Sequence, residues 1–158
     1  MNDQRKRAMG RKVVTACGGS VRGKTVAVLG LTFKPNTDDM RDSPAISIIT
    51  ALQDGGATIR AFDPEGMEPA KAVLPGGVTY CGNAYECVEG ADATVIVTEW
   101  NIFRALDLDR VRTLMKTPVL VDLRNIYRGE QVREKGFVYA DIGRGVLEAT
   151  SIDNEDAA

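Results

Sequence analysis

The chain has 158 residues, of which 44% are hydrophobic and 27% charged, and its formal net charge is −2. These values are typical of a soluble globular protein of one domain with flanking segments. No apolar run approaches the roughly 20 residues of a membrane span and no signal peptide opens the chain, so we exclude a membrane protein and expect a cytoplasmic location. The absence of histidine removes the usual general base near neutral pH and the commonest metal ligand.

The three cysteines, Cys17, Cys81 and Cys87, form no C-x-x-C pair and leave one cysteine over. Their number and spacing exclude a disulfide framework and a structural zinc site. We expect them to be small buried hydrophobic residues. A reactive role for Cys17 or Cys87 is the alternative.

Basic residues are concentrated at the beginning of the chain. The first 24 residues carry seven Lys or Arg and one acid, a net charge of +6, whereas the rest carries 13 basic and 21 acidic residues, a net charge of −8. A basic arm can bind nucleic acid or an anionic membrane, but no aromatic residues are interleaved here and the acidic remainder would repel phosphate polymers. We therefore expect neither partner, and we interpret residues 2–17 as the last part of a longer helix whose partner surfaces lie outside the domain.

Apolar strands and short helices alternate through the rest of the chain. The apolar β-type run in Thr25–Leu31 predicts a strand that ends at Gly30. Ser43-Pro44 predicts the start of a helix that reaches about Gln53. This alternation predicts an α/β fold, a doubly wound parallel Rossmann-like sheet in a single domain over 23–146, followed by a disordered tail over 147–158. The other expected strands are 58–62, 78–80, 93–97, 118–121 and 137–140, and the other expected helices are 68–73, 84–89, 108–115 and 131–135.

The loop between the first strand and the first helix carries Lys34 and Arg41. Open α/β sheets bind anionic ligands at the carboxyl ends of their strands, beside helix N-termini. Two cations there predict a pyrophosphate site, since arginine binds phosphate bidentately and lysine acts as a mobile point charge. The alternative is that Arg41 pairs with one of the loop's acidic residues. Asp38, Asp39 and Asp42 are expected to stabilise the helix N-terminus rather than to bind a metal.

Residues 25–45 resemble, almost residue for residue, the signature of the C-terminal domain of nucleotide-sugar dehydrogenases, the UDP-glucose and GDP-mannose dehydrogenases. Further motifs follow in the family's order, so that the resemblance covers roughly residues 2–145. These motifs are Asp63-Pro64, Ala91-Asp92, Thr98-Glu99-Trp100 with Phe103, Val121-Asp122-Leu123-Arg124-Asn125 and Gly143-Arg144.

The resemblance implies a function for four residues. In this family Phe33, Lys34 and Arg124 would contact the nucleotide sugar, and Arg41 would reach NAD held on another domain. Residues 1–22 would end the helix that connects the two domains and carries the interface of a homodimer. The implied substrate is a UDP-sugar, the implied cofactor is NAD, and the implied partner is an N-terminal NAD-binding domain.

The family's NAD fingerprint, G-x-G-x-x-G, and its glycine-flanked catalytic cysteine are absent from this chain. We therefore expect no catalytic residue here and an inactive fragment. Residues 32–39 are most similar to the UDP-glucose 6-dehydrogenases, which oxidise UDP-glucose to UDP-glucuronate with two NAD. The alternatives are a domain of a GDP-mannose or UDP-N-acetyl-mannosamine dehydrogenase, or a stand-alone nucleotide-binding or dimerisation module.

Other residues follow the ends of the expected strands. Arg124 could pair with Asp122 instead of contacting a ligand. Trp100 could stack on a base, but we expect its side chain to cover a helix junction. Asp63 occupies the place of a Rossmann ribose-binding acid; without the glycine fingerprint, we interpret it as a turn-forming residue.

Overall fold

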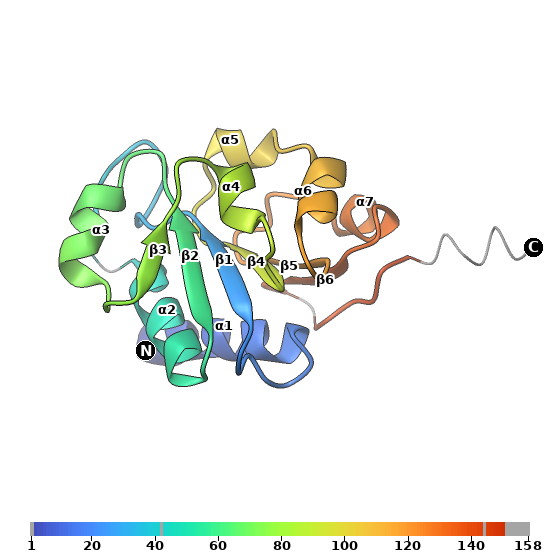
Figure 1. Ribbon diagram of the computed structural model, residues 1–158, viewed down its shortest axis with the longest axis horizontal. Helices are drawn as coiled ribbons and strands as arrows, with labels where there is room; N and C mark the ends of the chain where they lie inside the picture. The colour runs from blue at the N-terminus through green and yellow to red at the C-terminus, as the bar shows by residue number, and fades with distance from the viewer. Residues whose placement is uncertain (1, 42, 144, 151–158) are drawn as a thin grey trace, which may run out of the picture.

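The computed structural model describes residues 2–41, 43–143 and 145–150, with side chains from residue 7 onward. Six parallel strands form one sheet in the order β3-β2-β1-β4-β5-β6 (Figure 1). This is the strand order of a doubly wound fold, in which the order reverses between β1 and β4. The predicted fold class is confirmed. The strands are β1 (Thr25–Leu29), β2 (Thr58–Phe62), β3 (Val78–Tyr80), β4 (Ala93–Ile96), β5 (Val119–Asp122) and β6 (Val138–Asp141).

Helices cover both faces of the sheet. In Figure 1, α1 and α2 lie below the sheet and α4, α6 and α7 lie above it. Residues of α1, α2 and α3 form one hydrophobic core with the sheet, and residues of α4 to α7 form a second core on the opposite face. The helices are α1 (Asn2–Ala16), α2 (Pro44–Asp54), α3 (Met67–Val73), α4 (Ala84–Val88), α5 (Asn101–Arg104), α6 (Leu108–Leu114) and α7 (Gly129–Glu134).

Strand β1 shows why its sequence is a continuous apolar run rather than an alternating one. Val26 and Val28 belong to the core with α1 and α2, whereas Ala27 and Leu29 belong to the core on the other face. All four side chains are fully buried. A central parallel strand is buried on both faces, so each of its positions favours an apolar side chain.

Helix α1 packs on this domain through its inner face. Val13 is fully buried, and a Cβ placed on Gly10 would lie 3.2 Å from the Ala51 Cβ of α2. Glycine therefore permits the close approach of the two helices. The helix itself agrees with the predicted 2–17. The expectation that its partner surfaces lie outside the domain is wrong for this face, because the sheet and α2 cover it.

Two features differ from the sequence-based expectation. Helix α5 was not predicted, since four residues are too few for a helical period to appear in the sequence. The tail is ordered up to Thr150, because Leu147 pairs antiparallel with Tyr139 and the Thr150 N–H donates to the Arg133 carbonyl at 2.9 Å. Disorder is therefore wrong for 147–150, and the rest of that predicted tail, 151–158, lies outside the described residues.

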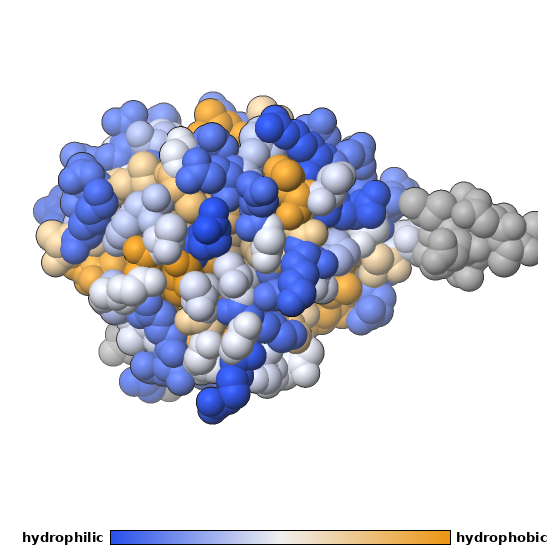
Figure 2. Space-filling view, viewed as in Figure 1, coloured by the Kyte–Doolittle hydropathy of each residue, from blue (hydrophilic) through white to orange (hydrophobic). Residues whose placement is uncertain are grey.

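Cys17, Cys81 and Cys87 are buried free thiols, as predicted. Figure 2 shows a face on which hydrophilic residues predominate and hydrophobic ones form small patches. Among the described residues, no helix is long and apolar enough to cross a bilayer.

Candidate functional site

The loop from Gly30 to Ser43 leaves the carboxyl end of β1 and leads into α2. Gly30 has φ +96°, and a Cβ at this position would lie 2.5 Å from the Thr98 backbone nitrogen, so only glycine fits. At the other end Ser43 caps α2, as predicted: its Oγ accepts the Ala45 N–H at 3.2 Å and donates to the Leu31 carbonyl at 2.5 Å. The Ser43 hydroxyl therefore fastens the end of the loop to its beginning.

Phe33 and Lys34 lie near the beginning of this loop, and both are exposed. Phe33 is 44% exposed, which is high for a large apolar residue. Its backbone N–H donates to the Asp39 carbonyl at 2.9 Å, and the Lys34 carbonyl lies 3.0 Å from the Thr32 hydroxyl. The backbone of the pair is thus held while the aromatic ring and the cation remain at the surface.

Arg41 forms a bidentate pair with Asp39. Its Nε lies 3.0 Å from Asp39 Oδ1 and its Nη2 lies 2.9 Å from Asp39 Oδ2. The alternative of an arginine paired within the loop is therefore observed, although the Arg41 side chain is still 89% exposed. Asp42 lies outside the described residues. In the part of the chain that the structure describes, no group of three His, Cys, Asp or Glu could hold a metal ion.

The Arg41 guanidinium lowers the pKa of Asp39 from 3.8 to about 2, chiefly through its hydrogen bonds to the carboxylate. Because the pKa of Asp39 is lower in the folded protein than in the unfolded one, the pair stabilises the fold at pH values above the unfolded pKa. This contribution is lost as the pH falls through about 2. We expect Arg41→Ala to return the Asp39 pKa toward 3.8, measured by a carboxyl ¹³C titration. Arg22→Ala, an exposed arginine elsewhere, is the control. An unchanged pKa in Arg41→Ala would contradict the pairing.

Arg124 lies directly after β5, and its side chain pairs with Glu99 rather than with Asp122. Its Nη2 lies 2.8 Å from Glu99 Oε2, while Asp122 Oδ1 accepts only the Arg124 backbone N–H at 3.2 Å. The alternative of an Arg124–Asp122 ion pair is therefore not what the structure shows. Asp122 is fully buried and its second oxygen accepts the Tyr127 N–H at 2.9 Å, so it shapes the turn after β5 instead.

Glu99 follows the end of β4, the strand beside β5. Partial burial is the largest single effect and raises the pKa of Glu99, but hydrogen bonds and nearby positive charge, chiefly from Arg124, together outweigh burial and lower the pKa below its ordinary value of 4.5. Its second oxygen, Oε1, is buried without a hydrogen-bond partner among the described residues. Glu99 belongs to the Thr98-Glu99-Trp100 motif, but its pairing with Arg124 was not predicted, because the pairing depends on the order of the strands.

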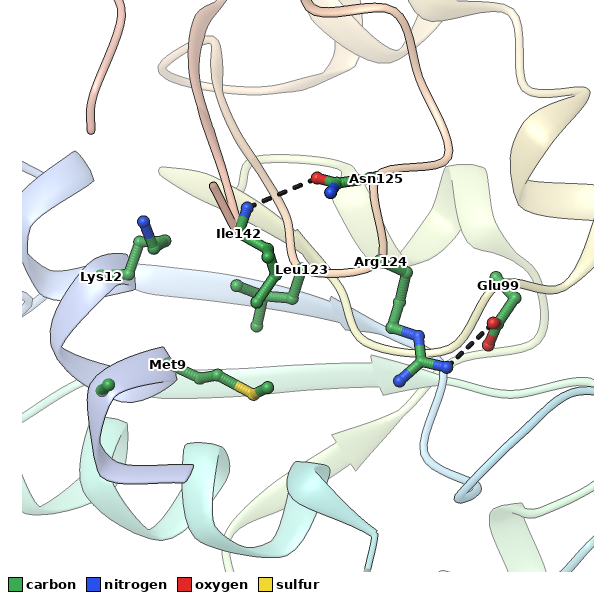
Figure 3. Close-up of a pocket in the computed structure, with 8 residues that line it drawn as sticks. Met9, Lys12, Glu99, Leu123, Arg124, Asn125 and Ile142 are labelled. Carbon is green, nitrogen blue, oxygen red and sulfur yellow. Dashed lines mark hydrogen bonds and ion pairs between the residues drawn. The ribbon is translucent and has the colours of Figure 1, made fainter. Parts of the chain in front are cut away.

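A cavity of about 600 Å³ lies between α1 and the carboxyl ends of β4, β5 and β6. Figure 3 shows Met9 and Lys12 of α1 facing Leu123 and Ile142, with the Arg124–Glu99 pair at one side. Of the four predicted site residues, only Arg124 lines this cavity. Phe33, Lys34 and Arg41 belong to the β1–α2 loop at the same edge of the sheet. The lining residues are Ala8, Met9, Lys12, Glu99, Leu123, Arg124, Asn125 and Ile142.

The turn after β1 does not fit the pyrophosphate of NAD. In a dinucleotide fold the backbone N–H groups of this turn point at the pyrophosphate. Here the Leu31 and Thr32 N–H groups donate to the Asp63 carboxylate at 2.7 Å and 3.1 Å. Asp63 also accepts the Glu65 N–H at 2.9 Å, which confirms it as a turn-forming residue. Trp100 is buried, as expected, with 7% of its surface exposed.

Comparison with known proteins identifies the domain. Residues 27–129 match the model of the UDP-glucose/GDP-mannose dehydrogenase family, UDP binding domain. The UDP-glucose 6-dehydrogenase of Rhizobium meliloti is 62% identical over 144 residues, which are 91% of this chain and 33% of that protein. The chain thus spans about a third of the length of this curated relative.

Solved structures agree with this match. An NDP-N-acetyl-D-galactosaminuronic acid dehydrogenase from Methanosarcina mazei is 29% identical with a TM-score of 0.76, covering 89% of this chain and 29% of the other. A UDP-glucose dehydrogenase from Pyrobaculum islandicum is 33% identical with a TM-score of 0.70, covering 85% and 29%. The family model covers well over half of the chain, and the chain therefore belongs to the UDP-glucose/GDP-mannose dehydrogenase family, of which it is the UDP-binding domain.

Proposed function

We propose that this domain binds the uridine diphosphate part of UDP-glucose within a UDP-glucose 6-dehydrogenase. The observation that carries the proposal is the position of Arg124, at the rim of a cavity of about 600 Å³ at the carboxyl edge of the sheet. This edge is where open α/β sheets bind their ligands. The 62% identity to the R. meliloti enzyme supports UDP-glucose over other nucleotide sugars.

The proposed contacts follow from charge and exposure. Lys34 and Arg124 carry the positive charge that a diphosphate requires, and the exposed Phe33 ring offers an apolar face beside Lys34. We propose that a phosphate oxygen and Glu99 compete for the Arg124 guanidinium, whose Nη2 donates to Glu99 Oε2 in this structure. Arg41 extends into solvent and is proposed to contact NAD bound outside this domain.

The domain's contribution to the reaction is binding and orientation. Contacts to the nucleotide, remote from the reacting carbon, hold the sugar in place and so convert binding energy into rate. NAD supplies the oxidising power in this family, and the turn after β1 is not where it is held. The cysteine nucleophile of the resembling enzymes likewise has no counterpart in the motifs of this chain.

A ligand titration tests the proposal directly. Binding at a hundred times the dissociation constant adds about 2.7 kcal/mol to stability, so UDP should raise the melting temperature by roughly 5–10 °C. Lys34→Ala should reduce this rise in melting temperature. Lys116→Ala should not, because Lys116 is an exposed lysine at the amino ends of the strands. Thermal shifts with UDP, GDP and NAD, measured in parallel, decide the nucleotide. A shift with GDP alone would indicate a GDP-mannose enzyme instead.

Catalytic activity provides a second test. Because we assign no nucleophile and no NAD site to this domain, the chain mixed with UDP-glucose and NAD should form no NADH. Absorbance at the NADH band measures this, with the complete R. meliloti enzyme as the positive control. Steady turnover by this chain would show that it holds its own catalytic groups.

A further inference from the structure

Asp63, at the end of β2, is a fully buried carboxylate on which three segments of the chain converge. The first is the turn after β1, the second is its own turn after β2, and the third is the indole of Trp100 after β4. Five N–H groups donate to its two oxygens. Oδ2 accepts from Leu31 N (2.7 Å), Thr32 N (3.1 Å) and Trp100 Nε1 (3.2 Å), and Oδ1 accepts from Glu65 N (2.9 Å) and Gly66 N (2.7 Å).

This set of donors requires an acceptor with two oxygens. Backbone and indole N–H groups can only donate, and leaving buried donors unpaired is costly. An asparagine has the same shape but offers one acceptor oxygen, so its NH₂ group would face the donors on one side. The carboxylate therefore takes the place that a bound anion would occupy at the turn after β1.

The same contacts determine the course of the β1–α2 loop. A Cβ on Gly66 would lie 2.4 Å from Thr32 Cγ2, so the two turns are in direct contact. The Thr98 hydroxyl donates to the Thr32 carbonyl at 2.7 Å from the other side. Thr32 immediately precedes Phe33 and Lys34, and its hydroxyl lies 3.0 Å from the Lys34 carbonyl. A displacement of Thr32 would therefore also displace Phe33 and Lys34, which follow it in the chain.

We propose that Asp63 is a positioning residue for the nucleotide sugar, which fixes the turn after β1 so that Phe33 and Lys34 face the ligand. The inference rests on the proposed function, since it gives those two residues a ligand to face. Asp63 itself is buried and touches no ligand. Its effect on binding passes through Leu31 and Thr32, and Thr32 directly precedes Phe33.

A purely structural role is the competing explanation, and Asp92 provides a matched control. Asp92 Oδ2 accepts the Thr25 N–H at 2.9 Å, so it is also an aspartate that caps the backbone of β1. It does so at the beginning of the strand, at the opposite edge of the sheet from the loop. Asp92→Asn should therefore lower stability without changing the affinity for UDP.

The test compares the two asparagine variants by calorimetric titration with UDP, at a low temperature where both are folded. We expect Asp63→Asn to bind UDP at least about tenfold more weakly than the parent chain, because the loop is no longer preorganised. Asp92→Asn should stay within about twofold. A folded Asp63→Asn that also binds within about twofold overturns the inference. So does an equal weakening in both variants, because that would reflect general destabilisation.

A measurement on the parent chain decides the question if Asp63→Asn does not fold. Coupling is reciprocal, so if the Asp63 contacts strengthen UDP binding, UDP must strengthen those contacts. Hydrogen exchange at the Leu31 and Thr32 amides and at the indole of Trp100, the single tryptophan of the chain, should slow when UDP is added. Exchange at Thr25 should not change. Unaltered exchange at all three reporter groups overturns the inference.

The two proposals fail in different ways. If the parent chain binds no UDP, the proposed function is wrong and the inference falls with it. If the parent binds UDP and Asp63→Asn binds it equally well, only the positioning role is wrong. A general loss of structure is recognised separately, because the circular dichroism of the variant would then differ from that of the parent.

Discussion

Replacing Gly30 by alanine should destabilise the domain by about 2–5 kcal/mol, the sum of an unfavourable backbone conformation and a steric clash. The backbone at Gly30 has φ +96°. A Cβ there would lie 2.5 Å from the Thr98 nitrogen and 2.6 Å from its Cβ and Oγ1. The obstacle is backbone next to the central strand β4, so it cannot rotate away as a flexible side chain would. Urea unfolding of the parent and the variant measures the loss.

Gly18 is the matched control for this prediction. Its φ is +94°, almost the same as that of Gly30, but a Cβ there would meet nothing within 4 Å. Gly18→Ala should therefore cost only the backbone term, about 1–2 kcal/mol. The difference between the two variants isolates the clash with Thr98. An equal loss in both would show that the approach of β1 to the Thr98 turn is not tight.

The elements of the fold were predictable because each has a local signal. The apolar run before Gly30, the Ser43-Pro44 helix start and the alternation of strands with short helices depend on neighbouring residues. Parallel pairing then follows from the crossover connections that alternating strands and helices form. Helix α5 escaped prediction because it is too short to have a period.

The partners of the site residues were less predictable, because they are set by contacts between distant parts of the chain. The Asp63 carboxylate accepts hydrogen bonds from Leu31 and Thr32, which lie 32 and 31 positions earlier in the chain, and from Trp100, which lies 37 positions later. The acceptor of the Arg124 side chain, Glu99, lies 25 positions earlier. The sequence placed Glu99 and Arg124 after two strands at the same rim. Nothing in the sequence made these strands neighbours, so the one ion pair considered for Arg124, as the alternative to a ligand contact, was with the nearby Asp122.

The Arg124–Glu99 pair also changes the description of the binding site. An exposed cation binds a phosphate by losing only water, whereas Arg124 in the proposed competition also gives up its contact with a carboxylate that is 28% exposed. Glu99 in turn would be left with neither oxygen paired, since its Oε1 already lacks a partner among the described residues. In the proposed competition, ligand binding therefore weakens the Arg124 contact, the largest of the effects that lower the pKa of Glu99. The net contribution of Arg124 to diphosphate affinity is then the difference between its interaction with the phosphate and its interaction with Glu99.

Removing this arginine should consequently have a large effect on binding. A hydrogen bond to a charged group contributes about 1.5–3 kcal/mol, so Arg124→Ala should weaken UDP binding by roughly 10-fold to 150-fold. Arg124→Lys should recover part of the loss, because it keeps the charge but not the planar guanidinium. Arg112→Ala, an exposed arginine in the last turn of α6, is the control. Calorimetric titration with UDP measures all three variants.

Glu99→Gln tests the competition itself, and we expect it to act in the opposite direction. Glutamine keeps the size of the side chain but removes the charge that holds the Arg124 guanidinium at 2.8 Å. UDP should then bind a few times more tightly than to the parent, because less interaction is lost when the arginine turns to the phosphate. Weaker binding would mean that Glu99 orients the guanidinium for the ligand. Unchanged binding in both Glu99→Gln and Arg124→Ala would make the pair a structural contact and leave Lys34 as the phosphate-binding cation.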